Sequence, residues 1–342
     1  DYLLAYLKTD VLLLADVFEN FREMSMNNYN LDPANYLSAP GLAWDAMLLK
    51  TGVELELISD LELLNFMEDM KRGGLCFVGS KRHVKANNKY LPDHDPSKPS
   101  NYIMYWDANN LYGWGMIQHL PYRNIRFNRE ITWDTIRNLP ADAPKGYALR
   151  VRFEFPEHLH DLFKEFPPCP ENMIPNMEQF SQHQKELGKK LGVISKTGKY
   201  NGNSKLVPHL QEHKDYVIHY RNLQFIESLG VKITEVKEIV EFDQKDWMAP
   251  YIQFNTERRK EARNDFEKEF FKLMNNSVFG KTMEQVKNRM KLHITTDEQN
   301  AKKWFSKINL KGSKDFDGMH LIEIYHTEIE YDKPLYVGSA IL

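Results

Sequence analysis

Two short motifs hold side chains whose types and spacing fit a chemical reaction. Residues 272–281 read Lys-Leu-Met-Asn-Asn-Ser-Val-Phe-Gly-Lys, and residues 107–113 read Asp-Ala-Asn-Asn-Leu-Tyr-Gly. The first motif supplies cations, an amide and an aromatic ring, whereas the second supplies a carboxylate and an aromatic ring. Phosphoryl transfer depends on positioned cations and metal ions rather than on covalent chemistry of the protein. The pair therefore indicates a site that polymerises nucleotides.

A helix through residues 260–279 would place the polar side chains of the first motif on one face. At about 100° per residue, one arc collects the side chains that would grip a triphosphate: Lys260, Lys268, Lys272, Asn276 and Phe279. The opposite arc would pack on a core: Ala262, Phe266, Phe270, Leu273 and Met274. A solvated basic helix is the alternative for Lys260 or Lys268 alone. That alternative does not explain an aromatic ring followed at once by Gly280, where another chain can approach closely.

Asp107 ends a run of aromatic and β-branched residues, 101–107, which predicts a buried strand. Mg²⁺ prefers one or two carboxylates together with substrate phosphates, so Asp107 and a carbonyl of the following turn are suitable ligands. Tyr112 would stack under the sugar ring of the nucleotide. Taken alone, an aspartate at the end of a strand is an ordinary turn or helix cap. The presence of the other motif downstream favours the metal ligand.

Both motifs resemble those of the family B DNA polymerases, and more narrowly those of the protein-primed branch. Motif A of that family, Asp-x-x-Ser-Leu-Tyr-Pro, corresponds to residues 107–113, and motif B, Lys-x-x-x-Asn-Ser-x-Tyr-Gly, corresponds to residues 272–280. Three residues depart from the pattern, namely Asn110, Gly113 and Phe279. Phe279 lacks the tyrosine hydroxyl that in the family helps to sense the nascent base pair. Discrimination between correct and wrong nucleotides is therefore the property that we expect to differ.

Three longer stretches, residues 109–116, 251–260 and 279–289, look most like polymerases of Polinton or Maverick transposons and their adintovirus-like relatives. This resemblance implies an α+β fold with a palm and fingers, and Mg²⁺ in a two-metal site. Its implied partners are primer-template DNA, deoxynucleoside triphosphates and a terminal priming protein. The expected location is inside the cell, and in the nucleus if the host of the mobile element is a eukaryote.

Residues 2–22 predict a helix with an acid in its apolar arc. That arc contains Leu3, Leu7, Leu14, Val17, Phe18 and Phe21. Asp10 falls near its centre, with Tyr6 one turn before, and a buried acid is costly unless it is paired or metal-bound. Tyr6-x-x-x-Asp10 resembles the third exonuclease motif of proofreading polymerases, which implies that Asp10 binds a metal ion and Tyr6 orients the attacking water. A core aspartate bonded to a neighbouring group is the alternative.

Two basic stretches are candidates for contact with DNA. Lys71-Arg72-Gly73-Gly74 opens a mixed basic and polar stretch that runs to Tyr90, and glycines beside cations suit a backbone that follows phosphates. The family carries a Tyr-x-Gly-Gly/Ala element in the corresponding place, although Lys71 stands where that element has Tyr. We expect DNA contacts from Arg72, Gly73, Gly74 and, after motif B, Lys281. Residues 185–205 predict a mobile loop within an insertion, in contact with template or with a priming protein. An ordinary turn is the alternative for the first stretch, and a solvated loop is the alternative for the second.

Composition places the chain of 342 residues among soluble globular proteins, with 42% apolar and 27% charged residues. The 45 basic and 48 acidic residues give a net charge of −3, which excludes a protein that binds DNA over its whole surface. Cys76 and Cys169 indicate neither a zinc site nor a disulfide framework, and a reducing compartment fits. The sequence has no apolar run long enough to span a bilayer and no signal peptide, so we expect no membrane partner.

The resemblance implies six consecutive segments. We expect an exonuclease remnant at 1–55, a linker at 56–100, a palm with motif A at 101–155, an insertion like a terminal-protein region at 156–250, fingers at 251–285, and further palm at 286–342. Strands are expected at 102–107, 147–155, 232–242 and 321–330, and helices near 205–229. The Tyr-x-Asp-Thr-Asp-Ser sequence of motif C is absent. We therefore expect this chain to be nearly inactive by itself; a non-enzymatic nucleic-acid-binding remnant of a mobile element is the alternative.

Overall fold

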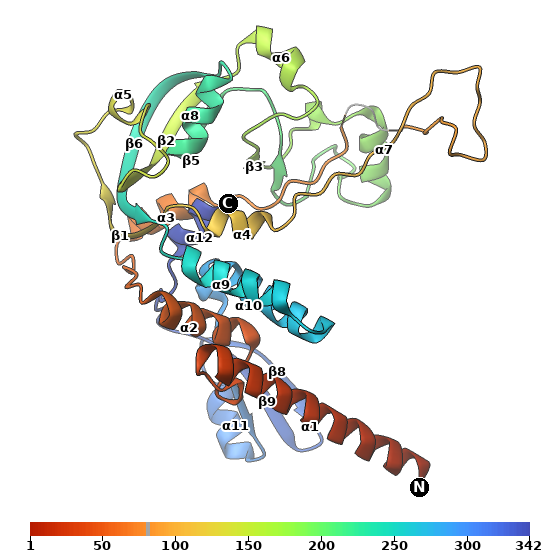
Figure 1. Ribbon diagram of the computed structural model, residues 1–342, viewed down its shortest axis with the longest axis vertical. Helices are drawn as coiled ribbons and strands as arrows, with labels where there is room; N and C mark the ends of the chain where they lie inside the picture. Colours follow the sequence, from red (N-terminus) through yellow and green to blue (C-terminus); the bar gives the residue numbers. More distant parts are fainter. Residues whose placement is uncertain (80–82) are drawn as a thin grey trace. The chain divides into compact units, whose positions relative to one another are not determined.

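A computed structural model describes residues 1–79 and 83–342 of the chain (Figure 1). The contacts divide it into two compact units, each assembled from segments that are distant in sequence. The first unit contains residues 1–64, 116–123 and 246–341, and the second contains residues 65–115 and 124–245 together with Leu342. The predicted boundaries of exonuclease, palm, insertion and fingers remain predictions.

The second unit is built on a four-stranded sheet with the order β1-β6-β2-β5. These strands are β1 (Leu120–Phe127, the second half of which belongs to this unit), β2 (Lys145–Glu154), β5 (His213–His219) and β6 (Lys232–Lys245). β2 pairs antiparallel with both β5 and β6. The strands predicted at 147–155 and 232–242 are thereby confirmed.

One face of this sheet carries the core of the second unit. Leu149, Val151 and Phe153 alternate along β2 and are fully buried, because period-two alternation places them on one side of the sheet. Helix α8 (Tyr220–Ser228) and the short helix α5 (Trp133–Ile136) cover this face and add apolar side chains to the same cluster (Figure 1).

Between β2 and β5 the chain forms a smaller lobe of short elements. They are α6 (Glu157–Phe163), β3 (Glu171–Met173), η2 (Met177–Gln179), α7 (Gln182–Lys190) and β4 (Lys205–Val207), and β3 pairs antiparallel with β4. The mobile loop predicted at 185–205 is wrong for residues 185–190, which are helical. Ser181 and Gln184 form a capping box that starts α7, a signal readable in the sequence.

The first unit consists mainly of helices. They are α1 (Tyr2–Tyr29), the turn η1 (Pro33–Asn35), α2 (Ala39–Thr51), α9 (Ala249–Glu261), α10 (Asp265–Thr282) and α12 (Leu335–Ile341). Buried side chains of α2, α9, α10 and α12 form its core. Helix α3 (Leu61–Met70) passes from the first unit into the second, and α4 (Leu111–Met116) passes back.

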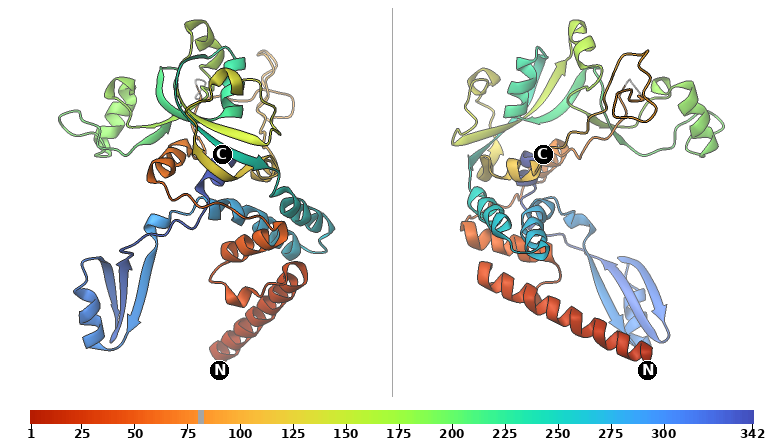
Figure 2. Two further views of the ribbon diagram at one scale, coloured as in Figure 1. Left: turned by 90° about the vertical axis from the view of Figure 1, so that its left-hand side faces the viewer. Right: turned by 45° about the vertical axis from the view of Figure 1, so that its right-hand side comes forward.

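A separate three-stranded sheet with the order β7-β9-β8 follows α10 and the turn η3 (Val286–Asn288). Its strands are β7 (Met290–Thr295), β8 (Leu310–Phe316) and β9 (Met319–Tyr325), and helix α11 (Glu298–Phe305) lies on one face (Figure 2). The strand predicted at 321–330 is confirmed only as far as Tyr325, and it belongs to this sheet rather than to the four-stranded one.

Three sequence-based expectations about burial and secondary structure are wrong, wholly or in part. Residues 101–107 form no strand, and Tyr105 and Trp106 are highly exposed, because no strand of the described chain pairs with them. The helices expected near 205–229 are confirmed only for α8, because residues 205–207 and 213–219 form β4 and β5, where strand pairing overrides local propensity. The apolar arc of α1 through Phe18 is exposed; burial begins near the C-terminal end of the helix, at Ser25 and Tyr29.

None of the helices in residues 1–79 and 83–342 combines the length and the hydropathy that crossing a membrane requires.

Candidate functional site

Residues 249–282 form two helices rather than the single helix expected from the sequence. α9 ends at Glu261, and Asn264 starts α10 by accepting a hydrogen bond from the main-chain N–H of Glu267 at 2.9 Å. Asparagine is a strong N-cap because its side chain satisfies a donor that the first turn leaves unpaired. Lys260 therefore lies on a different helix from Lys268 and Lys272, and its expected angular position relative to them is wrong.

A buried chain of hydrogen bonds holds α9 against α10. The Tyr29 hydroxyl donates to Asn255 Oδ1 at 2.5 Å, and Asn255 Nδ2 donates to Asn275 Oδ1 at 2.8 Å. The Tyr251 hydroxyl donates to the carbonyl of Met274 at 3.0 Å. Buried amides need partners of this kind because an unpaired polar group in a core is costly. The two adjacent asparagines of motif B thus differ: Asn275 faces α9, whereas Asn276 is exposed.

The face of α10 predicted to meet a nucleotide is open at the surface. Lys268, Lys272 and Asn276 follow one another at four-residue spacing and are exposed, and Phe279 is half-buried. A Cβ atom at Gly280 would meet no atom of the described residues within 4 Å, so this position leaves room for another molecule. The other arc is only partly as expected, because Phe270 and Met274 are buried but Phe266 and Leu273 are exposed.

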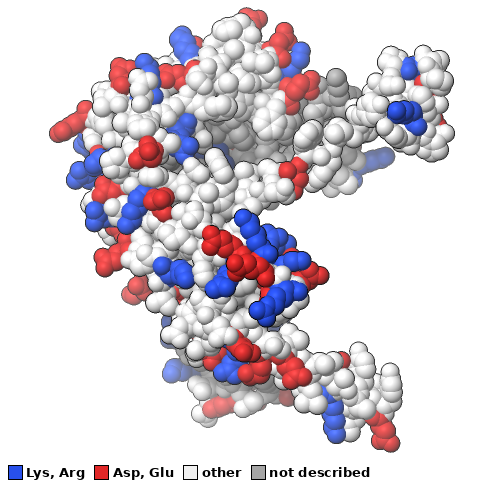
Figure 3. All heavy atoms as spheres, in the orientation of Figure 1, with Lys and Arg blue, Asp and Glu red and all other residues white. Residues whose placement is uncertain are grey.

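Acidic side chains accompany the lysines of this face. Lys268 Nζ lies 3.2 Å from Asp265 Oδ1, and Lys272 Nζ lies 3.1 Å from Glu269 Oε2. Figure 3 shows positive and negative side chains interspersed over the end of α9 and the start of α10. Exposed ion pairs one helical turn apart contribute little and separate easily. An incoming triphosphate can therefore take over these lysines without a large cost.

Lys281, predicted to contact DNA, lies in the last turn of α10. It belongs to a network of ion pairs that continues past the end of this helix. Lys281 Nζ lies 2.8 Å from Glu284 Oε2, and Arg289 Nε lies 2.8 Å from Glu284 Oε1. Arg289 also reaches Asp332 Oδ1 at 2.9 Å. The hydrogen bond from Arg289, assisted by that from Lys281, lowers the pKa of Glu284 to about 2. This network joins the end of motif B to the segment before α12.

Asp107 is exposed and is followed by a tight turn. Asn110 adopts the left-handed conformation with φ 53°, which asparagine tolerates better than most residues. The carbonyl of Asn110 then accepts the main-chain N–H of Trp114 at 3.0 Å, and α4 begins at Leu111. Tyr112 lies on the first turn of α4 and is 46% exposed. Asp107 and Tyr112 are therefore both exposed, one before this turn and one after it.

The predicted exonuclease residues lie at the surface of α1. Tyr6 and Asp10 are both exposed, so the argument that Asp10 occupies a buried face is wrong for the described residues. The first buried position of α1 is Ser25. Their predicted roles in metal binding and in orienting water remain predictions.

Arg72 is engaged inside the second unit instead of reaching outward. Its Nη1 donates to the carbonyl of Val217 at 2.6 Å, and its guanidinium stacks 3.5 Å over the ring of Tyr216. Burial lowers its pKa. Gly73 and Gly74 are exposed, and a Cβ atom at either would meet no described atom within 4 Å. Of this predicted DNA-contacting stretch, residues 80–82 lie outside the described residues.

Comparison with known proteins identifies the family of this chain. A family model described as DNA polymerase type B, organellar and viral, matches residues 1–331. The chain belongs to this family. None of the curated proteins compared with it matches.

Solved structures of phi29 DNA polymerase resemble the chain in fold. The binary complex with primer-template DNA in the post-translocation state gives a TM-score of 0.51 at 16% identity, over 98% of this chain and 47% of that chain. The ternary complex with primer-template DNA and incoming nucleotide gives 0.47 at 16% identity, over 90% and 43% respectively. The chain therefore spans about half the length of phi29 polymerase, and the likeness concerns the fold alone.

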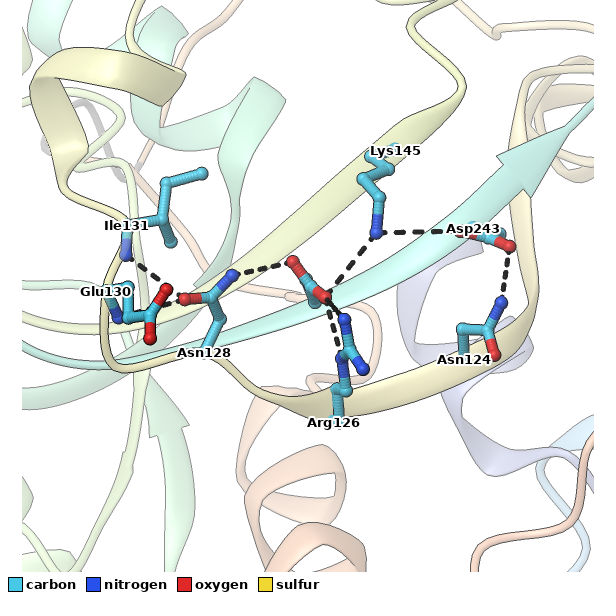
Figure 4. Close-up of polar contacts among 8 residues, drawn as sticks. Asn124, Arg126, Asn128, Glu130, Ile131, Lys145 and Asp243 are labelled. Carbon is cyan, nitrogen blue, oxygen red and sulfur yellow. Dashed lines mark hydrogen bonds and ion pairs between the residues drawn. The ribbon is translucent and has the colours of Figure 1, made fainter.

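A buried acid that the sequence did not indicate lies on β6, an interior strand of the four-stranded sheet. Glu241 of β6 is 3% exposed and accepts hydrogen bonds from Arg126 Nε and Asn128 Nδ2, each at 2.7 Å, while Lys145 Nζ lies 3.4 Å away (Figure 4). Burial would raise the pKa of Glu241, but the bonds from Asn128 and Arg126 outweigh it, so the pKa is lowered. The network joins β1 and the following turn to β6 and β2.

Asp107 and Asp10 do not belong to any group of three metal-ligating side chains in residues 1–79 and 83–342. The group that does occur there consists of Glu171, His209 and His213. The sequence signal for it was the spacing His-x-x-x-His at 209 and 213.

Proposed function

We propose that the chain is the part of a DNA-directed DNA polymerase that binds the incoming deoxynucleoside triphosphate and adds it to a 3′-hydroxyl on primer-template DNA. The observation that carries this proposal is the open face of α10, where two lysines, an amide and an aromatic ring stand together in a chain of the type B family. Family membership supplies the reaction, and the exposed face supplies a place for the nucleotide.

In this proposal each side chain of the α10 face has a separate task. Lys268 and Lys272 bind the β- and γ-phosphates, because cations at four-residue spacing can contact successive phosphate oxygens. Asn276 donates a hydrogen bond to the nucleotide, and Phe279 packs against the nascent base pair. Lys260, on α9, contributes a further positive charge. Lys281, Gly73 and Gly74 contact DNA, whereas Arg72 supports the sheet through the carbonyl of Val217.

The proposed metal ion is Mg²⁺, which would be held by Asp107 together with phosphate oxygens of the substrate. An exposed carboxylate beside a tight turn fits this ion, since Mg²⁺ keeps several waters and takes few protein ligands. The ion would stabilise negative charge that develops on the transferred phosphoryl group. Asp107 holds its ligand oxygen at that place, and Tyr112 supports the sugar. Asp10 and Tyr6 are proposed to play the corresponding parts in proofreading hydrolysis.

Nucleotide binding to the lysine face is the direct test. We expect Lys272→Gln and Lys268→Gln each to weaken binding of a fluorescent deoxynucleoside triphosphate by about tenfold, as loss of one charge-assisted contact would. Lys302→Gln is the matched control, because Lys302 is also a helix lysine of the first unit, with an ion pair to Glu298. Equal affinities in all three variants would contradict the proposed nucleotide face.

The same proteins separate a polymerase from a nucleic-acid-binding remnant of a mobile element. A remnant would bind primer-template DNA but would show no nucleotide affinity that depends on Lys272. Primer extension is measured on this chain and on any longer product of its reading frame. Template-directed extension that Lys272→Gln reduces supports the enzyme.

We further propose that synthesis starts from a protein hydroxyl, as family resemblance implies, with the lobe between β2 and β5 as the contact for the priming protein. The test is transfer of a labelled nucleotide to a partner protein in the absence of a DNA primer. Extension of DNA primers with no such transfer under any template condition would remove protein priming and leave the polymerase.

A further inference from the structure

Three side chains with metal-binding atoms meet at the base of the lobe between β2 and β5. Glu171 begins β3, His209 follows β4 and His213 begins β5, and one ligand atom of each lies within 4.8 Å of the other two. His209 Nε2 is 2.9 Å from Glu171 Oε2, and His213 Nε2 is 3.9 Å from the same oxygen. The proposed polymerase reaction uses none of these groups.

His213 is fixed in a buried position with one ring nitrogen unsatisfied. Its ring stacks between Phe153, at a centroid distance of 4.5 Å, and His209, at 4.3 Å. Its Nε2 lies 2.8 Å from the carbonyl oxygen of Cys169 and, because a carbonyl only accepts, carries the proton. Its Nδ1 is then a buried lone pair without a hydrogen bond of normal geometry among the described residues. Such an orphaned group is costly and requires an explanation.

A metal ion at Nε2 would remove this cost. The ring proton would move to Nδ1, which lies beside the main chain of Gln211, and histidine ligands commonly donate their second N–H to the backbone in this way. The carbonyl of Cys169 would then face a cation. Cys169 holds that carbonyl in place with a left-handed backbone at φ 58°, a conformation that cysteine rarely adopts.

The two outer ligands can move to complete the site. Zinc lies 2.0–2.2 Å from nitrogen and oxygen ligands, so tetrahedral donors stand about 3.3 Å apart. Glu171 and His209 are at the surface end of the group, with side chains 32% and 9% exposed, and can close on an ion held by His213. An ion at His209 Nε2 replaces the hydrogen bond between that nitrogen and Glu171 Oε2. The ring proton then moves to Nδ1, so the bond that Nδ1 accepts from the N–H of Gln211 at 3.2 Å is also lost.

We propose that Glu171, His209 and His213 bind one Zn²⁺ ion. Two imidazoles and one carboxylate form a donor set that suits zinc, whereas Mg²⁺ and Ca²⁺ prefer oxygen ligands alone. The carbonyl of Cys169 or a water molecule completes four-fold coordination.

The ion acts as a clamp at the base of the lobe. Glu171 and His209 are 38 positions apart, and His213 pairs with Phe153 of the central strand β2. One ion bound by all three therefore ties the paired strands β3 and β4 to the four-stranded sheet. Closing a long segment in this way stabilises the folded chain, because the binding free energy is available only when the site is assembled.

The test is metal binding to the whole chain. The protein is stripped with a chelator and titrated with Zn²⁺, and its metal content is measured after removal of excess ion. We expect one zinc per chain, a rise in melting temperature and slower proteolysis within residues 174–205. Co²⁺ should give the visible absorption of a tetrahedral site. Mg²⁺ at the same concentration should change none of these readings.

Matched variants separate this site from other histidines of the chain. Glu171→Gln and His209→Asn should lose the zinc and its effect on melting, whereas Glu178→Gln and His183→Asn, exposed residues of the same lobe, should retain both. His213→Asn is avoided as the principal variant because it opens the core. The proposal is overturned if the stripped chain takes up less than one zinc, or if His209→Asn binds zinc as tightly as His183→Asn. Either result would leave the proposed nucleotide binding by α10 untouched, because that proposal uses none of these zinc-binding residues.

Discussion

The side chain of Asn110 occupies the space that a Cβ atom at residue 113 would need. A Cβ atom built on Gly113 would lie 2.2 Å from Asn110 Nδ2 and 2.5 Å from Asn110 Cγ. The two residues at which the stretch 107–113 departs from the motif A pattern that it resembles are therefore coupled. Asn110 takes the left-handed turn after Asp107, and Gly113 leaves room for its amide.

This coupling predicts a non-additive pair of substitutions. Gly113→Ala should be mildly destabilising, by up to about 1 kcal/mol, because the exposed Asn110 amide must rotate away and this outweighs the gain in helix propensity. In an Asn110→Gly background the same change should be neutral or stabilising. Thermal melting of the four proteins of the double-mutant cycle measures the difference. Additive effects would mean that the two residues are independent.

Asp107→Asn should abolish Mg²⁺-dependent nucleotide binding and lower any extension activity by orders of magnitude. The amide keeps the shape of the side chain but removes the charge that holds the ion. Because Asp107 is exposed, the melting temperature should change little or rise. Asp142→Asn, another exposed acid of the second unit, is the control. If Asp107 only caps a turn, the variant should keep both its stability and its nucleotide affinity, because asparagine caps as well as aspartate.

Phe279→Tyr should improve discrimination between correct and mismatched nucleotides, by up to about tenfold for one added hydrogen bond. The added hydroxyl restores a group that the family resemblance assigns to sensing the nascent base pair. Phe266→Tyr places a hydroxyl on an exposed position of the same helix and should have no effect. The measurement is the ratio of affinities, or of extension rates, for matched and mismatched nucleotides. An unchanged ratio in Phe279→Tyr would show that this ring does not face the base pair.

Acid should weaken the network at the end of motif B. The folded-state pKa of Glu284 is about 2, below its ordinary value of 4.5, so its contribution is present above about pH 4.5 and is lost as the pH falls toward 2. Glu284→Gln should cost roughly 1–2 kcal/mol at pH 7 and progressively less at lower pH. Melting temperatures of wild type, Glu284→Gln and the exposed Glu330→Gln across this range test it. If the melting temperatures of wild type and Glu284→Gln fall in parallel as the pH is lowered, the Glu284 network does not cause the loss of stability in acid.

Local pattern in the sequence was sufficient for several elements. The alternation of Val151 and Phe153 with arginines predicts β2, because period two is a property of the strand itself. The polar face of Lys268, Lys272 and Asn276 follows in the same way from the helical period of α10. The residues of motifs A and B, and the family that they indicate, were also readable without coordinates, and the match over residues 1–331 confirms that family.

Other features depended on contacts between distant segments and could not be read from local pattern. Trp106 is exposed because no strand of the described chain pairs with its segment. Asn275 is buried and its neighbour Asn276 is exposed because α10 packs on α9. Strand β5 forms because β2 lies beside it. Glu171 and His209 meet only because β3 and β4 pair. The sequence determined the chemical types of the side chains and their period along each element. The tertiary structure decided which of them are buried, paired or brought together, because those properties depend on strand pairing and packing between residues far apart in the chain.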